Sequence, residues 1–136
     1  MPTFFVDNDL DAPDFVEPLL DAGFDLQLNR EHFGHKTSDE EWIATVASNG
    51  WFAFTHDRKI ARRRAQRELV LNVGLGLFIV RGKATHAVMG ANVAATYPKI
   101  IEVAETHPRP FIASVTRPDR VGEIVGRVNV LWPKDP

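Results

Sequence analysis

The chain has 136 residues, of which 44% are hydrophobic and 25% are charged. These fractions are typical of a globular protein and exclude a disordered or membrane-embedded chain. The length suits a single hydrophobic core, so we predict one domain over residues 1–136. The sequence contains no cysteine, which excludes disulfides and zinc–thiolate sites. Any metal must therefore be held by oxygen or imidazole ligands.

The net charge of −2 conceals an uneven distribution of charge along the chain. Residues 1–41 contain eleven Asp and Glu against two basic residues, whereas residues 42–136 contain fourteen Lys and Arg against seven acids. Two interpretations are open at this point. The asymmetry indicates either a site for a polyanion or a metal ion, or solvated helix faces that happen to differ in sign.

The sequence gives no sign of a membrane segment or an export signal. No apolar run approaches the roughly 20 residues that a membrane helix requires. The first seven residues, Met-Pro-Thr-Phe-Phe-Val-Asp, lack a basic start and a long apolar stretch, so we expect a cytoplasmic protein with no membrane partner.

In the first half of the chain, short apolar runs alternate with segments of helical spacing. These patterns predict strands over 3–6, 24–28 and 51–55, and helices over 14–22 and 38–49. The stretch 29–37 has no period and contains Gly34, so we expect a loop there. Ser38 is the predicted N-cap of the second helix and forms a capping box with Glu41.

The second half continues the alternation. We predict a basic helix over 57–68, strands over 75–80 and 111–115, and a helical segment over 85–105 with a kink or break at Pro98. Valine and isoleucine over 121–131 predict one or two further strands in a C-terminal extension, 121–136. Strands separated by helices predict an α/β fold with a mostly parallel sheet, covered on both faces.

Several carboxylates fall where a parallel sheet places its ligands, at the carboxyl ends of the strands. Asp7 directly follows the first predicted strand, with Asp9 two residues later, and Asp57 follows the third. Asp39 and Glu40 open the helix between the second and third strands. We therefore expect three separate elements to bring carboxylates to one edge of the sheet.

A cluster of carboxylates is costly without a cation, because like charges raise one another's pKa. A divalent cation removes that cost, and hard oxygen ligands favour Mg²⁺ or Mn²⁺. Such an ion can activate a water molecule and stabilise charge on a phosphodiester.

Structural roles compete with this interpretation. Helix capping and the helix dipole explain acids in the first turn of a helix, which covers Asp39, Glu40 and, for the next helix, Asp57. Asp9 can be a turn residue. A different metal site, with His32 and His35 beside Asp39, would favour a transition metal.

Three segments together resemble the PIN-like superfamily, and most closely its compact VapC-toxin-like members. They are Phe-Phe-Val-Asp-Asn-Asp-Leu at 4–10, Ser-Asp-Glu-Glu-Trp-Ile at 38–43 and Thr-His-Asp-Arg at 55–58. Those families have a strand that ends in Asp, an Asp-Glu pair that opens a helix, and a Thr-x-Asp motif after the next strand. The resemblance covers about residues 3–60.

The resemblance implies a three-layer α/β/α fold and an Mg²⁺- or Mn²⁺-dependent endoribonuclease, the toxin of a toxin–antitoxin pair. RNA is then the substrate, an antitoxin protein is the partner, and a homodimer is an open option. Asp7, Asp39 and Asp57 match the metal-ligand carboxylates, and Thr55 matches the hydroxyl that orients them. Asp9 and Glu40 match auxiliary acids. The chain lacks the later acid that larger members carry, and a catalytically silent binding module is the alternative function.

The predicted basic helix begins next to Asp57. Arg58, Arg62, Arg63 and Arg64 are our candidates for contacts with RNA phosphates. The alternative is a helix with solvated charged faces, whose arginine stems cover apolar surface.

Overall fold

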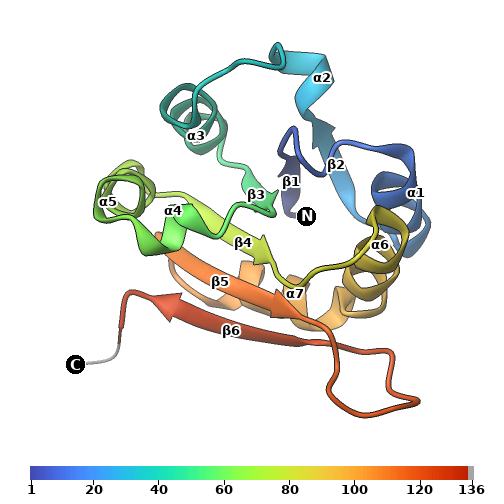
Figure 1. Cartoon of the computed structure of the whole chain (residues 1–136). Helices are drawn as coiled ribbons and strands as arrows, with labels where there is room; N and C mark the ends of the chain where they lie inside the picture. The colour runs from blue at the N-terminus through green and yellow to red at the C-terminus, as the bar shows by residue number, and fades with distance from the viewer. Residues whose placement is uncertain (135–136) are drawn as a thin grey trace.

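The computed structural model describes residues 1–134, and in it a six-stranded sheet lies between two layers of helices (Figure 1). The strand order is β2-β1-β3-β4-β5-β6, and all neighbouring strands are parallel except β5 and β6. The predicted α/β class with a mostly parallel sheet is confirmed. The strands are β1 (Thr3–Val6), β2 (Asp25–Leu28), β3 (Phe52–Thr55), β4 (Gly76–Val80), β5 (Phe111–Thr116) and β6 (Arg127–Trp132).

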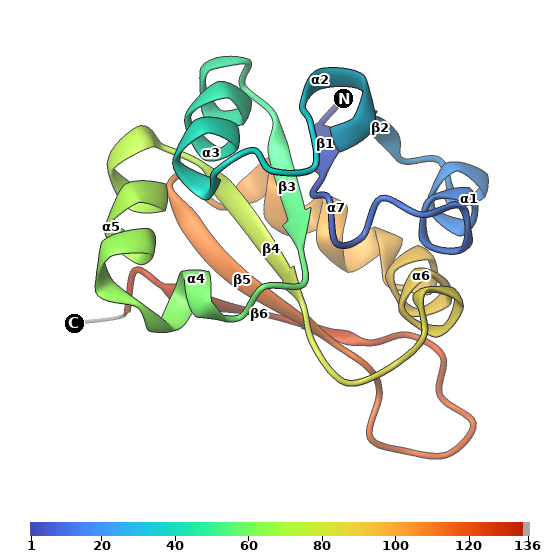
Figure 2. The ribbon, with the colours of Figure 1, turned by 45° about the horizontal axis from the view of Figure 1, so that its top comes forward.

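Each face of the sheet has its own helices and its own core, as the rotated view shows (Figure 2). One face packs against α1 (Pro13–Ala22), α6 (His86–Ala95) and α7 (Tyr97–Thr106). The other face packs against α3 (Asp39–Ser48), α4 (Lys59–Arg62) and α5 (Arg64–Val73). These helices make the two outer layers of an α/β/α arrangement.

The central strands are apolar on both faces because successive side chains point to opposite sides. In β1, Phe4 and Val6 join the core under α1, whereas Phe5 joins the core under α3. All three side chains are fully buried. This double burial explains why the strands are recognisable as continuous apolar runs without alternation.

Gly76 at the start of β4 makes room for aromatic side chains of its neighbours. It pairs with Phe52 on one side and Phe111 on the other. A Cβ at this position would lie 2.5 Å from the Phe52 ring and 2.9 Å from the Phe111 ring, far inside van der Waals contact. The two rings themselves lie with centroids 6.0 Å apart. This glycine is therefore a packing residue, not part of a phosphate-binding loop.

Two sequence predictions need correction. The predicted loop 29–37 contains a short helix, α2 (Asn29–His32). Its first turn is held locally by the Leu28 N–H, which donates to Glu31 Oε1 at 2.9 Å, and from outside by Asp11, whose Oδ2 accepts from the Arg30 N–H at 2.9 Å. Because Asp11 is distant in sequence, the local pattern did not indicate this helix.

The predicted single basic helix over 57–68 is also wrong. It is interrupted at Arg63, whose φ of −85° and ψ of 123° are extended. The interruption lets Ile60 and Val70 both reach full burial in the same core, and the Arg67 guanidinium donates to the Ala61 carbonyl at 3.1 Å. Helix propensity is a weak preference that such tertiary packing overrides.

The predicted break near Pro98 and the predicted strand in the C-terminal extension are both present. The expected break near Pro98 separates α6 from α7, and Pro98 lies in the first turn of α7, where proline is tolerated. Among the described residues of the C-terminal extension, 121–134, Arg127–Trp132 is the only strand, and it runs antiparallel to β5. The final residues of the predicted extension, 135–136, lie outside the described residues. In the described part of the chain, 1–134, none of the helices combines the length and apolar character needed to cross a membrane.

Candidate active site

Asp7 is held at the carboxyl end of β1 by its neighbour β3. Its backbone N–H continues the strand pairing by donating to the Phe54 carbonyl at 3.0 Å. Its side chain is only 8% exposed and accepts two hydrogen bonds: from Thr55 Oγ1 to Oδ2 at 2.8 Å and from the Asn8 N–H to Oδ1 at 2.7 Å. Both carboxylate oxygens are therefore fixed in orientation.

Thr55 also joins Asp7 to Asp57. The buried Thr55 hydroxyl accepts a hydrogen bond from the Asp57 N–H at 3.2 Å while it donates to Asp7. The Asp57 side chain uses Oδ1 to accept from the Lys59 N–H at 2.9 Å, in an Asx-type turn at the start of α4. The capping interpretation of Asp57 is thus correct for one oxygen, while the residue also faces the hollow described below.

Asp39 is positioned by the helix that it opens. Ser38 Oγ accepts from the Glu41 N–H at 3.2 Å, which is one half of the predicted capping box. Asp39 Oδ1 accepts from Trp42 Nε1 at 3.0 Å. Trp42 is buried and stacks on Phe5 with ring centroids 5.6 Å apart, so the core of the α3 layer orients this carboxylate.

The predicted aspartates line one hollow of about 190 Å³ at the carboxyl end of the sheet. Asp7 and Asp9 come from the loop after β1, Asp57 from the loop after β3, and Asp39 from the first turn of α3. No residue after Asp57 lines this hollow. Its remaining lining residues are Asn8, Asn29, Gly34, His35, Thr37 and Trp42.

Two candidates from the sequence lie elsewhere. Glu40 is exposed and does not line the aspartate hollow; it lines a neighbouring hollow between α3 and α5, which Asp39 also borders. His32 contacts Gln27 Oε1 at 2.8 Å and packs beside Trp51, whereas His35 lines the aspartate hollow. His32 does not line the aspartate hollow, so of the alternative imidazole site only His35 and Asp39 are brought to one hollow.

The electrostatics of the hollow are those of crowded carboxylates. Burial, followed by the charge of Asp9, raises the pKa of Asp7 from 3.8 to about 7, against the lowering effect of the bonds from Thr55 and Asn8. Burial also raises the pKa of Asp9, and the backbone and imidazole of His56 oppose that shift. Without a counter-ion, these groups resist simultaneous ionisation.

Asn29 and His56 are site residues that the sequence interpretation missed. Asn29 is 3% exposed and its Nδ2 lies 3.4 Å from Asn8 Oδ1. It directly follows β2, so the rule that singled out Asp7 would also have found it. The His56 ring nitrogen Nδ1 lies 2.7 Å from the Val80 carbonyl oxygen, an acceptor only, so Nδ1 carries the proton. This contact fixes the imidazole next to the hollow.

The donor set suits a hard divalent cation, since all four charged ligand candidates are carboxylates. Among residues 1–134, no three histidine, aspartate or glutamate side chains are gathered closely enough to hold an ion as they stand. Mg²⁺ needs only one or two direct carboxylates and retains several waters. The residues therefore fit the ion chemically, with ligation completed by water.

Comparison with known proteins identifies the family. A sequence model of the family described as "PIN like domain" matches residues 2–82, which is more than half of the chain. The chain belongs to the PIN-like domain family. The match includes β1, α3, β3 and the whole aspartate hollow, and it extends past the segment 3–60 that carries the sequence resemblance.

A curated PIN-like relative gives the same indication over a longer span. The chain is 38% identical over 116 residues to a protein of Mycobacterium tuberculosis (strain ATCC 25618 / H37Rv) named "Putative ribonuclease VapC45". The alignment covers 82% of this chain and 83% of the relative. The likeness to VapC-type proteins is therefore confirmed. No solved structure matches the chain.

Proposed function

We propose that this PIN-like protein is an Mg²⁺- or Mn²⁺-dependent endoribonuclease and the toxin of a toxin–antitoxin pair. The observation that carries the proposal is the hollow in which four aspartates from three elements meet, with Thr55 bonded to Asp7. The ribonuclease name of the Mycobacterium tuberculosis relative supports RNA as the substrate. We include an antitoxin protein and a second copy of the chain among its partners, and we place it in the cytoplasm.

In this proposal Asp7, Asp39 and Asp57 hold the cation, and Asp9 assists through water. When bound, the cation activates a water molecule and offsets the charge that develops on the phosphodiester. Thr55 keeps the Asp7 carboxylate oriented, and Trp42 does the same for Asp39. The exposed Glu40, which lines a different hollow, is a weaker candidate for an auxiliary ligand than the sequence implied.

The raised pKa of Asp7 gives this residue a specific role. Because burial raises its pKa to about 7, the carboxyl of Asp7 keeps its proton to a higher pH than an ordinary aspartate does. A cation binds only the ionised form, so metal binding competes with protons and releases them. We therefore expect activity to rise with pH through the neutral range.

The test is cleavage of single-stranded RNA by the purified chain with Mn²⁺ or Mg²⁺. EDTA should stop the reaction, and Asp57→Asn should abolish it while the fold is retained by circular dichroism. Expression should arrest growth, and the same substitution should relieve the arrest. A folded chain that neither cleaves RNA nor binds metal would favour the catalytically silent binding module instead.

We also infer that residues 1–136 act as one PIN-like domain. All six strands of the described residues belong to one sheet, and β6 closes the edge that β5 would otherwise expose. The C-terminal extension therefore protects a strand edge that could pair with another chain.

A further inference from the structure

Three arginines leave neighbouring strands at the end of the sheet that carries the aspartates. Arg58 is the third residue after the end of β3. Arg81 directly follows β4, and Arg117 directly follows β5. The Arg81 N–H donates to the Val115 carbonyl at 3.0 Å, so strand pairing continues one residue past β4. This bond fixes Arg81 beside the segment that ends in Arg117.

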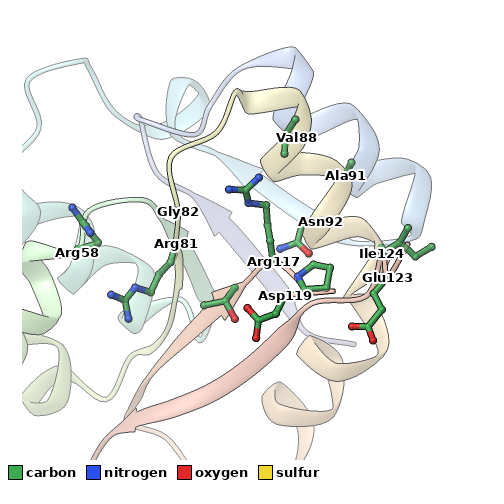
Figure 3. Close-up of a pocket in the computed structure, with 13 residues that line it drawn as sticks. Arg58, Arg81, Gly82, Val88, Ala91, Asn92, Arg117, Asp119, Glu123 and Ile124 are labelled. Atoms are coloured by element: carbon green, nitrogen blue, oxygen red, sulfur yellow. The ribbon is translucent and has the colours of Figure 1, made fainter. Parts of the chain in front are cut away.

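These three side chains line a hollow of about 960 Å³ next to α6, separate from the aspartate hollow. Figure 3 shows Arg58 and Arg117 on opposite sides of the segment that leaves β4, with Arg81 on that segment. The Arg117 guanidinium lies over Gly82, 3.7 Å from the place that a Cβ would occupy. Apolar side chains of α6, among them Val88, line another part of this hollow.

Three arginines and two acids line this hollow, so its lining carries a net positive charge. None of the three arginines forms an ion pair with another residue of the described chain, 1–134. Of the two acids that line the hollow, Asp119 is paired with Arg127 at 2.6 Å. Glu123 lies beside Ile124, across the hollow from Arg58 (Figure 3). The Arg58 side thus carries positive charge that a polyanion would neutralise.

A second hollow, of about 260 Å³, extends the same basic surface. It shares Arg58 and Arg81 with the first and adds Arg62, Trp132 and Lys134. A surface that runs through both hollows suits an extended chain of phosphates better than a single anion. Guanidinium groups also match phosphate oxygens in a two-pronged geometry.

The basic helix predicted from the sequence gives less support for phosphate contacts. Arg63 and Arg64 line neither basic hollow. Arg64 is exposed and bonded to Glu68 at 2.8 Å, an ordinary surface pair within a helix. Only Arg58 and Arg62 of the four candidates therefore face the basic hollows.

We propose that Arg81 and Arg117, together with Arg58, bind backbone phosphates of the RNA strand. The inference rests on the proposed function for the identity of the polyanion. It assigns Arg81 and Arg117 as substrate-binding residues and moves the principal phosphate contacts from the basic segment 58–64 toward the ends of β4 and β5.

Binding of a fluorescein-labelled 20-nucleotide single-stranded RNA tests this, by anisotropy in EDTA over a range of KCl concentrations. Each phosphate contact on single strands contributes about 0.7 to the slope of log affinity against log salt. Arg81→Gln and Arg117→Gln should each weaken binding about five-fold at 0.1 M salt and reduce the slope by about 0.7. Arg81→Lys should retain most of the slope.

Arg120→Gln is the matched control, because Arg120 is exposed on the same loop as Arg117 but does not line the hollow. Equal affinities and slopes for Arg120→Gln, Arg81→Gln and Arg117→Gln would overturn the inference. The inference would also be overturned if the wild-type chain bound a poly-glutamate peptide through Arg81 and did not bind RNA. That result would indicate a protein partner.

Cleavage in Mn²⁺ separates this inference from the proposed function. Loss of RNA affinity in the two variants without any cleavage by the wild type would retain the phosphate contacts and reject the nuclease. Normal cleavage and binding by both variants would retain the nuclease and reject the contacts.

Discussion

Thr55 and Asp7, which are 48 residues apart in the chain, are joined by a buried hydrogen bond of 2.8 Å between Thr55 Oγ1 and Asp7 Oδ2. The bond exists because β1 and β3 are parallel neighbours whose carboxyl ends coincide. The same hydroxyl accepts from the Asp57 N–H. One threonine thus ties together the two strand ends that supply Asp7 and Asp57 to the hollow.

Thr55→Val should destabilise the chain by about 1–3 kcal/mol, because it leaves a buried carboxylate oxygen and a backbone N–H without a partner. Thr55→Ser keeps the hydroxyl and should retain most of that stability. Urea unfolding of both variants measures the difference. Equal stability of the valine and serine variants would mean that the hydroxyl contributes nothing.

The pH dependence of stability follows from the raised pKa of Asp7. Folding raises its pKa from the ordinary aspartate value of 3.8 to about 7, so the folded state binds the proton more tightly. The resulting stabilisation is fully present below about pH 4 and is lost as pH rises through 7. Relative to Asp7→Asn, the metal-free wild type should lose up to on the order of 4 kcal/mol between pH 4 and pH 8. A constant difference across that range would contradict the shifted pKa.

Divalent cations should reverse this loss. Mn²⁺ binds the ionised carboxylates and the folded state only, so it should raise the melting temperature more at pH 8 than at pH 5. Asp7→Asn should remove most of the response, whereas Asp21→Asn, which changes an exposed acid on α1, should not. An equal response in the two variants would place the bound ion outside the hollow.

Substitutions of the adjacent acids Asp39 and Glu40 on α3 provide a matched pair for an assay of RNA cleavage. Asp39 lines the aspartate hollow and borders the hollow toward α5, whereas Glu40 lines only the hollow toward α5. Asp39→Asn should reduce RNA cleavage by on the order of 100-fold or more, and Glu40→Gln should leave it within about 2-fold. If Glu40→Gln reduces RNA cleavage as much as Asp39→Asn does, Glu40 is the auxiliary ligand that the resemblance implied.

The sequence alone predicted the features that depend on local pattern and strand ends. Fully apolar runs identified the parallel strands because both faces of the sheet are covered, and the acid after β1 could be placed from that alone. Asp57 could be placed in the same way, from the end of β3.

Features that depend on distant partners could not be predicted. The helix α2 is capped by Asp11, and the interruption at Arg63 is set by burial of Ile60 and Val70 in one core. The basic surface at Arg81 and Arg117 requires knowing that β4 and β5 are neighbours. For the same reason, charge density along the chain favoured Arg63 and Arg64, which the fold turns away from both basic hollows.

The most direct test of the account is the anomalous scattering of manganese in a crystal of the chain soaked in Mn²⁺ near pH 8. We predict a peak within coordination distance of Asp7, with Asp39 or Asp57 as a further ligand and water completing the set. A chain that cleaves RNA in Mn²⁺ but shows no manganese in this hollow, or shows it only elsewhere, would contradict the assignment.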